Sequence, residues 1–117
     1  MLRMMCKSKI HRARITKVDL HYEGSIGIDK DLLKASDIYP NEIVQVVNID
    51  NGSRFETYAI EEPSGSGVIS LYGAAAHLGK VGDLVIIFSY GLVDDKKSGH
   101  LKLKLVRVDS VNRIFKK

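Results

Sequence analysis

The chain has little of several residue types, and each shortage excludes a class of protein. Its 117 residues contain one cysteine, Cys6, two prolines and no tryptophan. A single cysteine rules out an intrachain disulfide and any zinc site built from several cysteines, and it fits a reducing compartment. No apolar run approaches the roughly 20 residues needed to cross a bilayer, and the N-terminus lacks the apolar centre of a secretory signal. We therefore expect a cytoplasmic protein with no membrane partner.

The composition otherwise fits one folded domain, because 44% of the residues are hydrophobic and 27% are charged. The net charge is +4, and the basic residues gather in a cationic strip before the first acid, Asp19. The strip consists of Arg3, Lys7, Lys9, Arg12, Arg14 and Lys17. It is compatible with a nucleic-acid arm, a transit peptide, the wall of a site for an acidic small molecule, or ordinary solvated charge.

Strand patterns dominate the chain. A β-branched run from Ile43 to Ile49 ends at Asn51-Gly52, which is the strongest short signal for a hairpin turn. Alternation after this turn separates two faces, one with Arg54, Glu56 and Tyr58 and the other with Phe55, Thr57 and Ala59. The apolar run 83–90 predicts a strand buried on both sides. Alternation in 101–108 predicts an edge strand or subunit contact with Leu101, Leu103 and Leu105 facing inward.

Helical signals are short. Residues 29–38 predict a helix with Asp29 as N-cap and Leu32, Leu33 and Ser36 on one side, and the small residues 73–77 predict a helical turn. No repeat or linker divides the chain. The sum is a mainly β, single-domain protein with one or two short helices, and a closed or nearly closed β-barrel suits the pattern.

Common catalytic motifs are absent. The four histidines accompany no GxSxG nucleophile elbow, no two of them have the i, i+4 spacing of a helical zinc site, and no glycine motif for phosphate is present. A nucleic-acid-binding barrel is weakened by an aromatic content of 7% and by the lack of a strand that alternates aromatic and basic residues.

The dipeptide Gly24-Ser25 offers a different chemistry. A serine hydroxyl that is held against the carbonyl carbon of the preceding residue can convert the amide to an ester. Glycine leaves that carbonyl unhindered and permits unusual backbone angles. Elimination and hydrolysis would then leave a pyruvoyl group at Ser25. Gly-Ser is also a common loop dipeptide, as Gly65-Ser66 illustrates, so the context must decide.

That context is provided by three stretches, LHYEGSIGID, NGSRFETYAI and GAAAH, in this order and spacing. Over residues 1 to about 90 the chain resembles the pyruvoyl-dependent aspartate 1-decarboxylases. The resemblance implies a six-stranded double-psi β-barrel and a homotetramer with active sites between subunits. It also implies formation of β-alanine and CO₂ from L-aspartate for pantothenate and coenzyme A synthesis, without a metal or pyridoxal phosphate, and cleavage into chains 1–24 and 25–117.

The same resemblance implies roles for individual residues. Ser25 becomes the pyruvoyl group and Schiff-base site after cleavage behind Gly24, and Tyr58 donates a proton to the decarboxylated carbon. Thr57 assists cleavage and binds substrate. The other substrate-binding residues are Lys9, His11, Tyr22, Arg54, Gly73, Ala74 and Ala75. Because Thr57 and Tyr58 alternate along one strand, we expect a bend or bulge near Thr57. The sequence names no maturation partner.

Two positions depart from the family pattern. Tyr72 stands where the family usually has asparagine before Gly-Ala-Ala-Ala, and Val47 stands where an aromatic residue can occur. Tyr72 keeps open a related pyruvoyl decarboxylase for another amino acid. Arg54 is suited to hold the retained carboxylate of aspartate through two hydrogen bonds, with Lys9 as a looser point charge.

Overall fold

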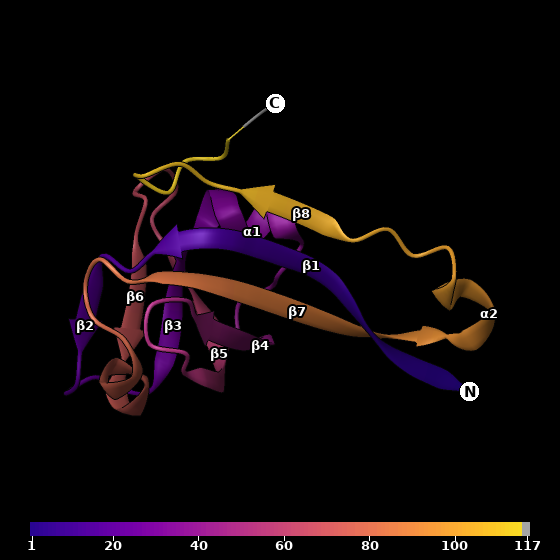
Figure 1. Ribbon diagram of the computed structural model, residues 1–117, viewed down its shortest axis with the longest axis horizontal. Coiled ribbons are helices and arrows are strands. Elements are labelled where there is room, and N and C mark those ends of the chain that lie inside the picture. The colour runs from indigo at the N-terminus through magenta and orange to yellow at the C-terminus, as the bar shows by residue number, and fades with distance from the viewer. Residues whose placement is uncertain (116–117) are drawn as a thin grey trace.

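The computed structural model describes residues 1–115 and is mainly β (Figure 1). Eight strands form one sheet in the order β2-β6-β3-β5-β4-β7-β1-β8. Their bounds are β1 Leu2–Arg14, β2 Lys17–Asp19, β3 Ser25–Asp29, β4 Ile43–Asn48, β5 Arg54–Glu62, β6 Ile69–Tyr72, β7 Leu84–Asp94 and β8 Lys104–Arg107. The arrangement is consistent with the small β-barrel that the sequence predicts. The predicted number of strands was six, and the two further strands, β2 and β8, are short and lie at the ends of the order.

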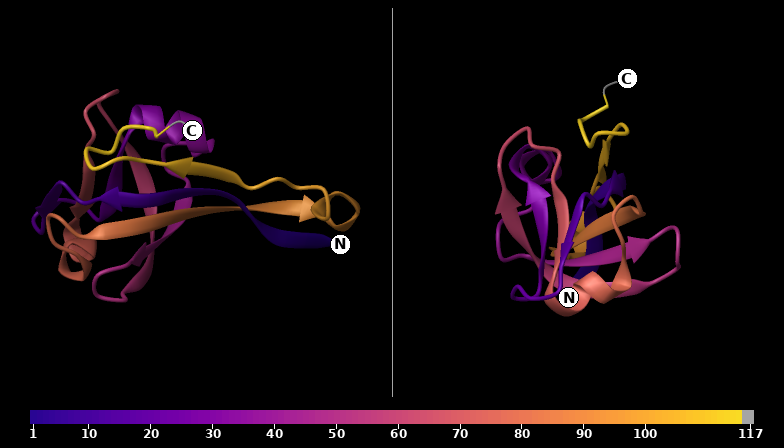
Figure 2. Two further views of the ribbon diagram at one scale, coloured as in Figure 1. Left: turned by 45° about the horizontal axis from the view of Figure 1, so that its top comes forward. Right: turned by 90° about the vertical axis from the view of Figure 1, so that its left-hand side faces the viewer.

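Strands β1 and β7 form a long antiparallel ribbon along the length of the molecule, and the N-terminus and helix α2 (Asp95–Ser98) lie at its far end (Figures 1 and 2). The pairing runs from Leu2 with Asp94 to Arg14 with Leu84. Its register shifts twice, between Cys6 and Ser8 and between Ile10 and Ala13. Arg12 lies in the second irregularity with a φ of 65°. Such bulges redirect the side chains of a strand.

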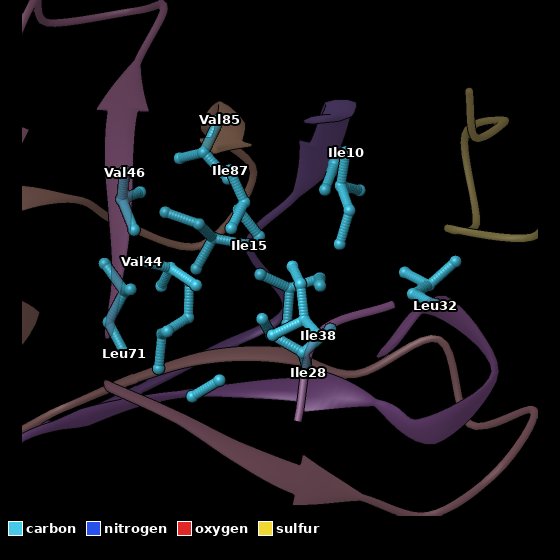
Figure 3. Close-up of a cluster of buried hydrophobic side chains, with 14 of the residues drawn as sticks. Ile10, Ile15, Ile28, Leu32, Ile38, Val44, Val46, Leu71, Val85 and Ile87 are labelled. Carbon is cyan, nitrogen blue, oxygen red and sulfur yellow. The ribbon is translucent and has the colours of Figure 1, made fainter. Parts of the chain in front are cut away.

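The core is made of alternate residues from most of the strands (Figure 3). Ile10, Ile26, Ile28, Val44 and Val46 are fully buried, and Ile69, Leu71, Val85 and Ile87 join them. Branched aliphatic side chains fit a pleated surface that is covered on one side. Helix α1 (Lys30–Ser36) adds Leu32 and Leu33, and the Asp29 carboxylate caps it by accepting from the Asp31 N–H at 2.8 Å, so the predicted helix is confirmed.

Two other predictions about local structure are also confirmed. The turn between β4 and β5 contains Gly52 with a φ of 78°, which is the positive angle that the Asn-Gly signal requires. Residues Gly73–Leu78 form the short 3₁₀ helix η1 where the small residues predicted a helical turn.

Three predictions about strand faces and register were wrong. Burial alternates along β7, where Val85 and Ile87 are buried while Ile86 and Phe88 are only partly so, because only one face of this strand meets the core. Leu101, Leu103 and Leu105 remain 37%, 46% and 39% exposed, and Val106 is the residue of β8 that reaches the core. The bulge expected near Thr57 is also absent, since the β4–β5 register runs without a shift from Ile43 and Tyr58 to Val47 and Arg54.

Asn112 anchors the segment after β8 to the rest of the fold through hydrogen bonds of its side chain. The residue is 1% exposed. Its amide donates to the carbonyl oxygens of Arg14 and Gly67 at 2.8 Å each, and its oxygen accepts from the Arg14 N–H at 2.7 Å. One side chain thus joins the end of β1 to the loop before β6. The residue also adopts a φ of 60°, which asparagine tolerates better than most residues.

Substituting Asn112→Ala is expected to lower the free energy of unfolding by about 2–4 kcal/mol, because buried backbone groups lose their partners. Urea unfolding followed by circular dichroism measures this loss. Asn41→Ala is the matched control, since Asn41 is exposed with a φ of 74°, and it should lose only about 1 kcal/mol. Equal losses for the two variants would show that Asn112 contributes only its backbone conformation.

Candidate functional site

Gly24 and Ser25 lie where the chain leaves a turn and enters β3. Gly24 is exposed, whereas Ser25 is only 1% exposed. The Ser25 Oγ is buried and has no hydrogen-bond partner among residues 1–115. An unpartnered buried hydroxyl is unfavourable by about 1–3 kcal/mol, so it needs an explanation other than stability. It is a free nucleophile next to the carbonyl of Gly24.

Gly73, at the junction of β6 and η1, packs closely against Gly24. Its φ is 65°, and a Cβ built on it would lie 2.8 Å from both the Cα and the N of Gly24 and 2.9 Å from the Tyr22 carbonyl oxygen. No residue larger than glycine fits at position 73 without moving the chain around Gly24. In the adjoining ladder Ser25 pairs with Tyr72, so both sides of the Gly24-Ser25 bond are held by residues 72–73.

Tyr58 lies on the other side of Ser25. Ile26 pairs with Ala59 in the parallel β3–β5 ladder, so the residues one step earlier, Ser25 and Tyr58, are neighbours on adjacent strands. Tyr58 is partly buried. Thr57 pairs with the fully buried Val44, so the pleat directs Thr57 to the core side and away from the face of Tyr58.

The other residues near Gly24 and Gly73 differ in exposure. Ala74 is exposed and Ala75 is 8% exposed, both within η1. Tyr22 is 56% exposed, and its ring centroid lies 4.6 Å from that of Tyr72. The structure therefore gathers Tyr22, Gly24, Ser25, Tyr58 and Gly73 in one region, named here the Ser25 region.

Lys9 and Arg54 lie in a second group on the outer face of the β1-β7-β4-β5 sheet. The Lys9 Nζ is 5.4 Å from the centroid of the Phe88 ring. The Gln45 Oε1 accepts from the Arg54 Nη1 at 2.9 Å and from the Tyr90 hydroxyl at 2.7 Å. Gln45 thus fixes the guanidinium of Arg54 while leaving most of its donors free. Within one chain, these contacts link the two cations to other residues rather than to Ser25.

His11 follows Lys9 on β1 and pairs with Arg107 in the β1–β8 ladder. Its Nδ1 is buried and has no hydrogen-bond partner in the part of the chain that the structure describes. Burial lowers the pKa of His11 below the usual 6.5, and the neighbouring cations Lys9, Arg12 and Arg107 lower it further. His11 is therefore an uncharged imidazole at neutral pH, placed among positive charges.

This shift predicts a pH dependence of stability. Below pH 6.5 the unfolded chain protonates His11 more readily than the folded chain does, so the free energy of unfolding falls as the pH drops and is fully retained above that value. The urea midpoint should decline as the pH falls below about 6.5, and His11→Gln should flatten part of this decline. His100→Gln, at an exposed position, should retain it. Identical pH profiles for all three proteins would contradict the assignment to His11.

A carboxylate that the sequence analysis missed completes the Ser25 region. The Glu62 Oε2 accepts from the Tyr72 hydroxyl at 2.6 Å and from the Ser70 hydroxyl at 2.7 Å. Glu62 lies four residues after Tyr58 on the same strand face, so strand alternation could have found it. Tyr72 was noticed only as a departure from the family pattern, and its partner comes from a different strand.

The residues of the cationic strip have different local partners. Arg3 pairs with Asp95, and the Lys7 ammonium lies 3.4 Å from the Glu42 carboxylate. The Arg14 guanidinium donates to the Gly82 carbonyl at 2.8 Å, and the Lys17 Nζ lies 5.5 Å from the centroid of the Tyr72 ring. Most of these charges have separate local partners, which is unlike a nucleic-acid-binding arm.

Two features were sought over residues 1–115. No group of three or more His, Cys, Asp or Glu side chains in this range is arranged to hold a metal ion. No helix in the same range has both the length and the apolar character that crossing a membrane requires.

Comparison with known proteins agrees with the resemblance. The family model described as aspartate decarboxylase matches residues 1–115, which extends the similarity beyond residue 90. A protein named aspartate 1-decarboxylase from Thermoanaerobacter pseudethanolicus is 55% identical over 113 residues, covering 97% of each chain. Proteins of the same name from Carboxydothermus hydrogenoformans and Syntrophobacter fumaroxidans are 56% and 53% identical, covering 96% and 97% of this chain and 88% and 91% of their own.

A small β-barrel with this match along almost its full length is an enzyme of the decarboxylase class. More narrowly, the chain belongs to the aspartate decarboxylase family.

Proposed function

We propose that this protein is a self-processing enzyme that removes the α-carboxylate of L-aspartate as CO₂ and releases β-alanine, as a step toward pantothenate and coenzyme A. The names and the identity of the relatives support the reaction. The observation in this chain that supports it best is the buried, unpartnered hydroxyl of Ser25 beside an exposed glycine. A cytoplasmic location follows from such a biosynthetic role and fits a chain with a single cysteine.

The first chemical event is an intramolecular acyl transfer. The Ser25 Oγ adds to the carbonyl carbon of Gly24, the bond from that carbon to the Ser25 nitrogen breaks as the hydroxyl proton passes to this nitrogen, and an ester and a free amine replace the amide. Loss of the Ser25 Cα proton then expels the Gly24 carboxylate as the end of chain 1–24. Water converts the remaining dehydroalanine to a ketone and ammonia, so chain 25–117 begins with a pyruvoyl group.

The residues around Ser25 fit such a group. Ile26 pairs with Leu71 on one side and with Ala59 on the other, so the start of β3 stays anchored by its neighbours when the bond to Gly24 is lost. Gly73 has no Cβ, so the space beside Gly24 stays open and would remain open to a substrate after chain 1–24 separates from Ser25. When present, a pyruvoyl ketone supplies an electron sink for decarboxylation of an amino acid that is bound through its amine.

The chain's own residues bind the substrate and move protons. Tyr58, next to Ser25 across the β3–β5 ladder, is suited to donate its phenolic proton to the substrate carbon that loses CO₂. Arg54, braced by Gln45, is suited to hold the retained carboxylate, and Lys9 supplies a second positive charge. His11, Tyr22, Thr57 and the loop Gly73, Ala74 and Ala75 would complete the pocket.

We further propose that the pocket is completed in a homotetramer, with each active site between subunits. Lys9 and Arg54 contact residues other than Ser25 within one chain, so a second subunit offers a way to bring these charges to a pyruvoyl group. Met4, Leu92 and Ile43 are 70%, 69% and 58% exposed and surround one hollow of about 330 Å³. Exposed apolar surface of this kind is typical of subunit contacts.

Intact mass under denaturing conditions tests the self-cleavage. The mature protein should give two masses, for chains 1–24 and 25–117, and the larger chain should lack a free amine. CO₂ release from L-aspartate, compared with L-glutamate and neutral amino acids, tests the substrate. A full-length mass that persists through long warm incubation would overturn the proposal, and faster turnover of another amino acid would correct the substrate.

A further inference from the structure

The Glu62 carboxylate occupies a place that only glycine at position 27 leaves open. A Cβ built on Gly27 would lie 2.0 Å from the Glu62 Oε2 and 2.2 Å from the Ser70 Oγ. Gly27 is two residues after Ser25 on β3, so both residues present the same face of that strand. Glu62, Ser70 and Tyr72 therefore form a hydrogen-bonded group directly over Gly27, named here the Glu62 network.

This network holds the Tyr72 side chain at its hydroxyl end. The backbone of Tyr72 pairs with Ser25, its ring packs 4.6 Å from that of Tyr22, and its hydroxyl donates to Glu62. Burial raises the pKa of Tyr72, and the hydrogen bond to Glu62 raises it further. The phenol therefore stays protonated at neutral pH and remains a donor to the carboxylate.

The connection reaches the bond that we propose is cleaved. Tyr22 lies two residues before Gly24, and its carbonyl oxygen, like Gly24 itself, is in close packing with Gly73. Tyr72 directly precedes Gly73. A shift of the Tyr72 ring would therefore disturb the residues on both sides of the Gly24-Ser25 bond, where small displacements strongly reduce the rate of attack.

We propose that Glu62 is a positioning residue for self-cleavage, which fixes Tyr72 and thereby the approach of the Ser25 hydroxyl to the Gly24 carbonyl. The inference rests on the self-cleavage proposed above. It assigns a role to Tyr72 and to the carboxylate that accepts from the Tyr72 and Ser70 hydroxyls in the space left open by Gly27.

The test compares the half-times of cleavage of freshly purified full-length chains, followed by intact mass well below each variant's melting temperature. Glu62→Ala and Tyr72→Phe should both cleave about tenfold more slowly, the effect expected from losing one hydrogen bond to a charged group. Glu61→Ala is the matched control, since Glu61 is exposed and adjacent in sequence, and it should cleave at the wild-type rate. Glu62→Gln keeps an acceptor oxygen and should restore most of the rate.

Gly27→Ala gives an independent readout, because it leaves every hydrogen-bonding group in place but puts a methyl group where the carboxylate lies. Gly27→Ala should slow cleavage about as much as Glu62→Ala does. The variant that combines Gly27→Ala with Glu62→Ala should be no slower than either single variant, because both substitutions disturb the same carboxylate. Gly99→Ala, at a position where a Cβ meets no atom within 4 Å, should have no effect.

Each outcome has a distinct meaning. A wild-type chain that never cleaves would overturn both the self-cleavage and the role of Glu62. A wild-type chain that cleaves, together with Glu62→Ala and Tyr72→Phe variants that match Glu61→Ala, would overturn the role of Glu62 alone. A Glu62→Gln variant as slow as Glu62→Ala would overturn it too, because positioning needs only the acceptor oxygen.

Discussion

Substituting Ser25→Ala is expected to leave a single, uncleaved chain and to abolish decarboxylation of L-aspartate. Alanine has no hydroxyl to attack the Gly24 carbonyl, so neither the ester nor the ketone derived from it can form. The loss should be at least about a million-fold, which is the lower end of the accelerations that enzymes achieve. Intact mass and CO₂ release measure the two effects on the same sample.

The side chain of Ser25 is a suitable target because it makes no hydrogen bond to any described residue that the substitution would break. Alanine preserves the backbone pairing of residue 25 with Tyr72 and fills nearly the same volume. The variant should therefore fold, and its circular dichroism and melting temperature should show a stable protein. A loss of activity in a folded, uncleaved chain is then attributable to the missing hydroxyl.

The chain contains its own control in Gly65-Ser66, another Gly-Ser dipeptide. Ser66 is exposed in the loop before β6, and its hydroxyl oxygen accepts from the Val68 N–H at 3.2 Å. Ser66→Ala should cleave and decarboxylate as the wild type does. Borohydride reduction with L-aspartate present should add mass to chain 25–117 of the wild type and of Ser66→Ala. Cleavage that persists in Ser25→Ala would move the reactive bond elsewhere.

Local structure could be predicted from the sequence wherever a few adjacent residues determine it. The cap at Asp29, the turn at Gly52 and the 3₁₀ helix after Gly73 all depend on contacts or backbone angles within one short segment. The neighbours of Ser25 were reached differently, through the resemblance, because their strands are separated in sequence. The position of Tyr58 beside Ser25 depends on the parallel β3–β5 pairing, which no local pattern specifies.

The wrong predictions about strand faces and register also concern contacts between strands that are far apart in the sequence. The alternation predicted for 101–105 was wrong, because residues 101–103 lie outside β8, all of 101–105 are exposed, and the side that is covered depends on how β8 meets β1. The register shifts occur in β1, where it pairs with β7, rather than near Thr57. Glu62 was identified only from the structure, in which β5 and β6 place its carboxylate beside the hydroxyls of Tyr72 and Ser70.

Substituting Gly73→Ala is expected to slow self-cleavage by at least about a hundredfold, because the new methyl group would overlap Gly24. The Cβ would lie 2.8 Å from the Gly24 Cα and N, and both are backbone atoms that cannot rotate away. The chain must shift, and a displacement of about 1 Å at a reacting centre can reduce a rate by about that factor. Intact mass over time measures the rate, and thermal unfolding measures the accompanying loss of stability.

The backbone angle and the overlap can be separated with Gly52→Ala. Gly52 has a φ of 78°, close to the 65° of Gly73, but a Cβ there meets no atom within 4 Å. Both variants should lose about 1 kcal/mol of stability from forcing alanine into the left-handed region. Only Gly73→Ala should also lose the rate of cleavage, because only its methyl group meets the bond that breaks. Equal cleavage rates in the two variants would mean that Gly24 can move aside without leaving the reach of the Ser25 hydroxyl, and the close packing of Gly73 would then have no part in the reaction.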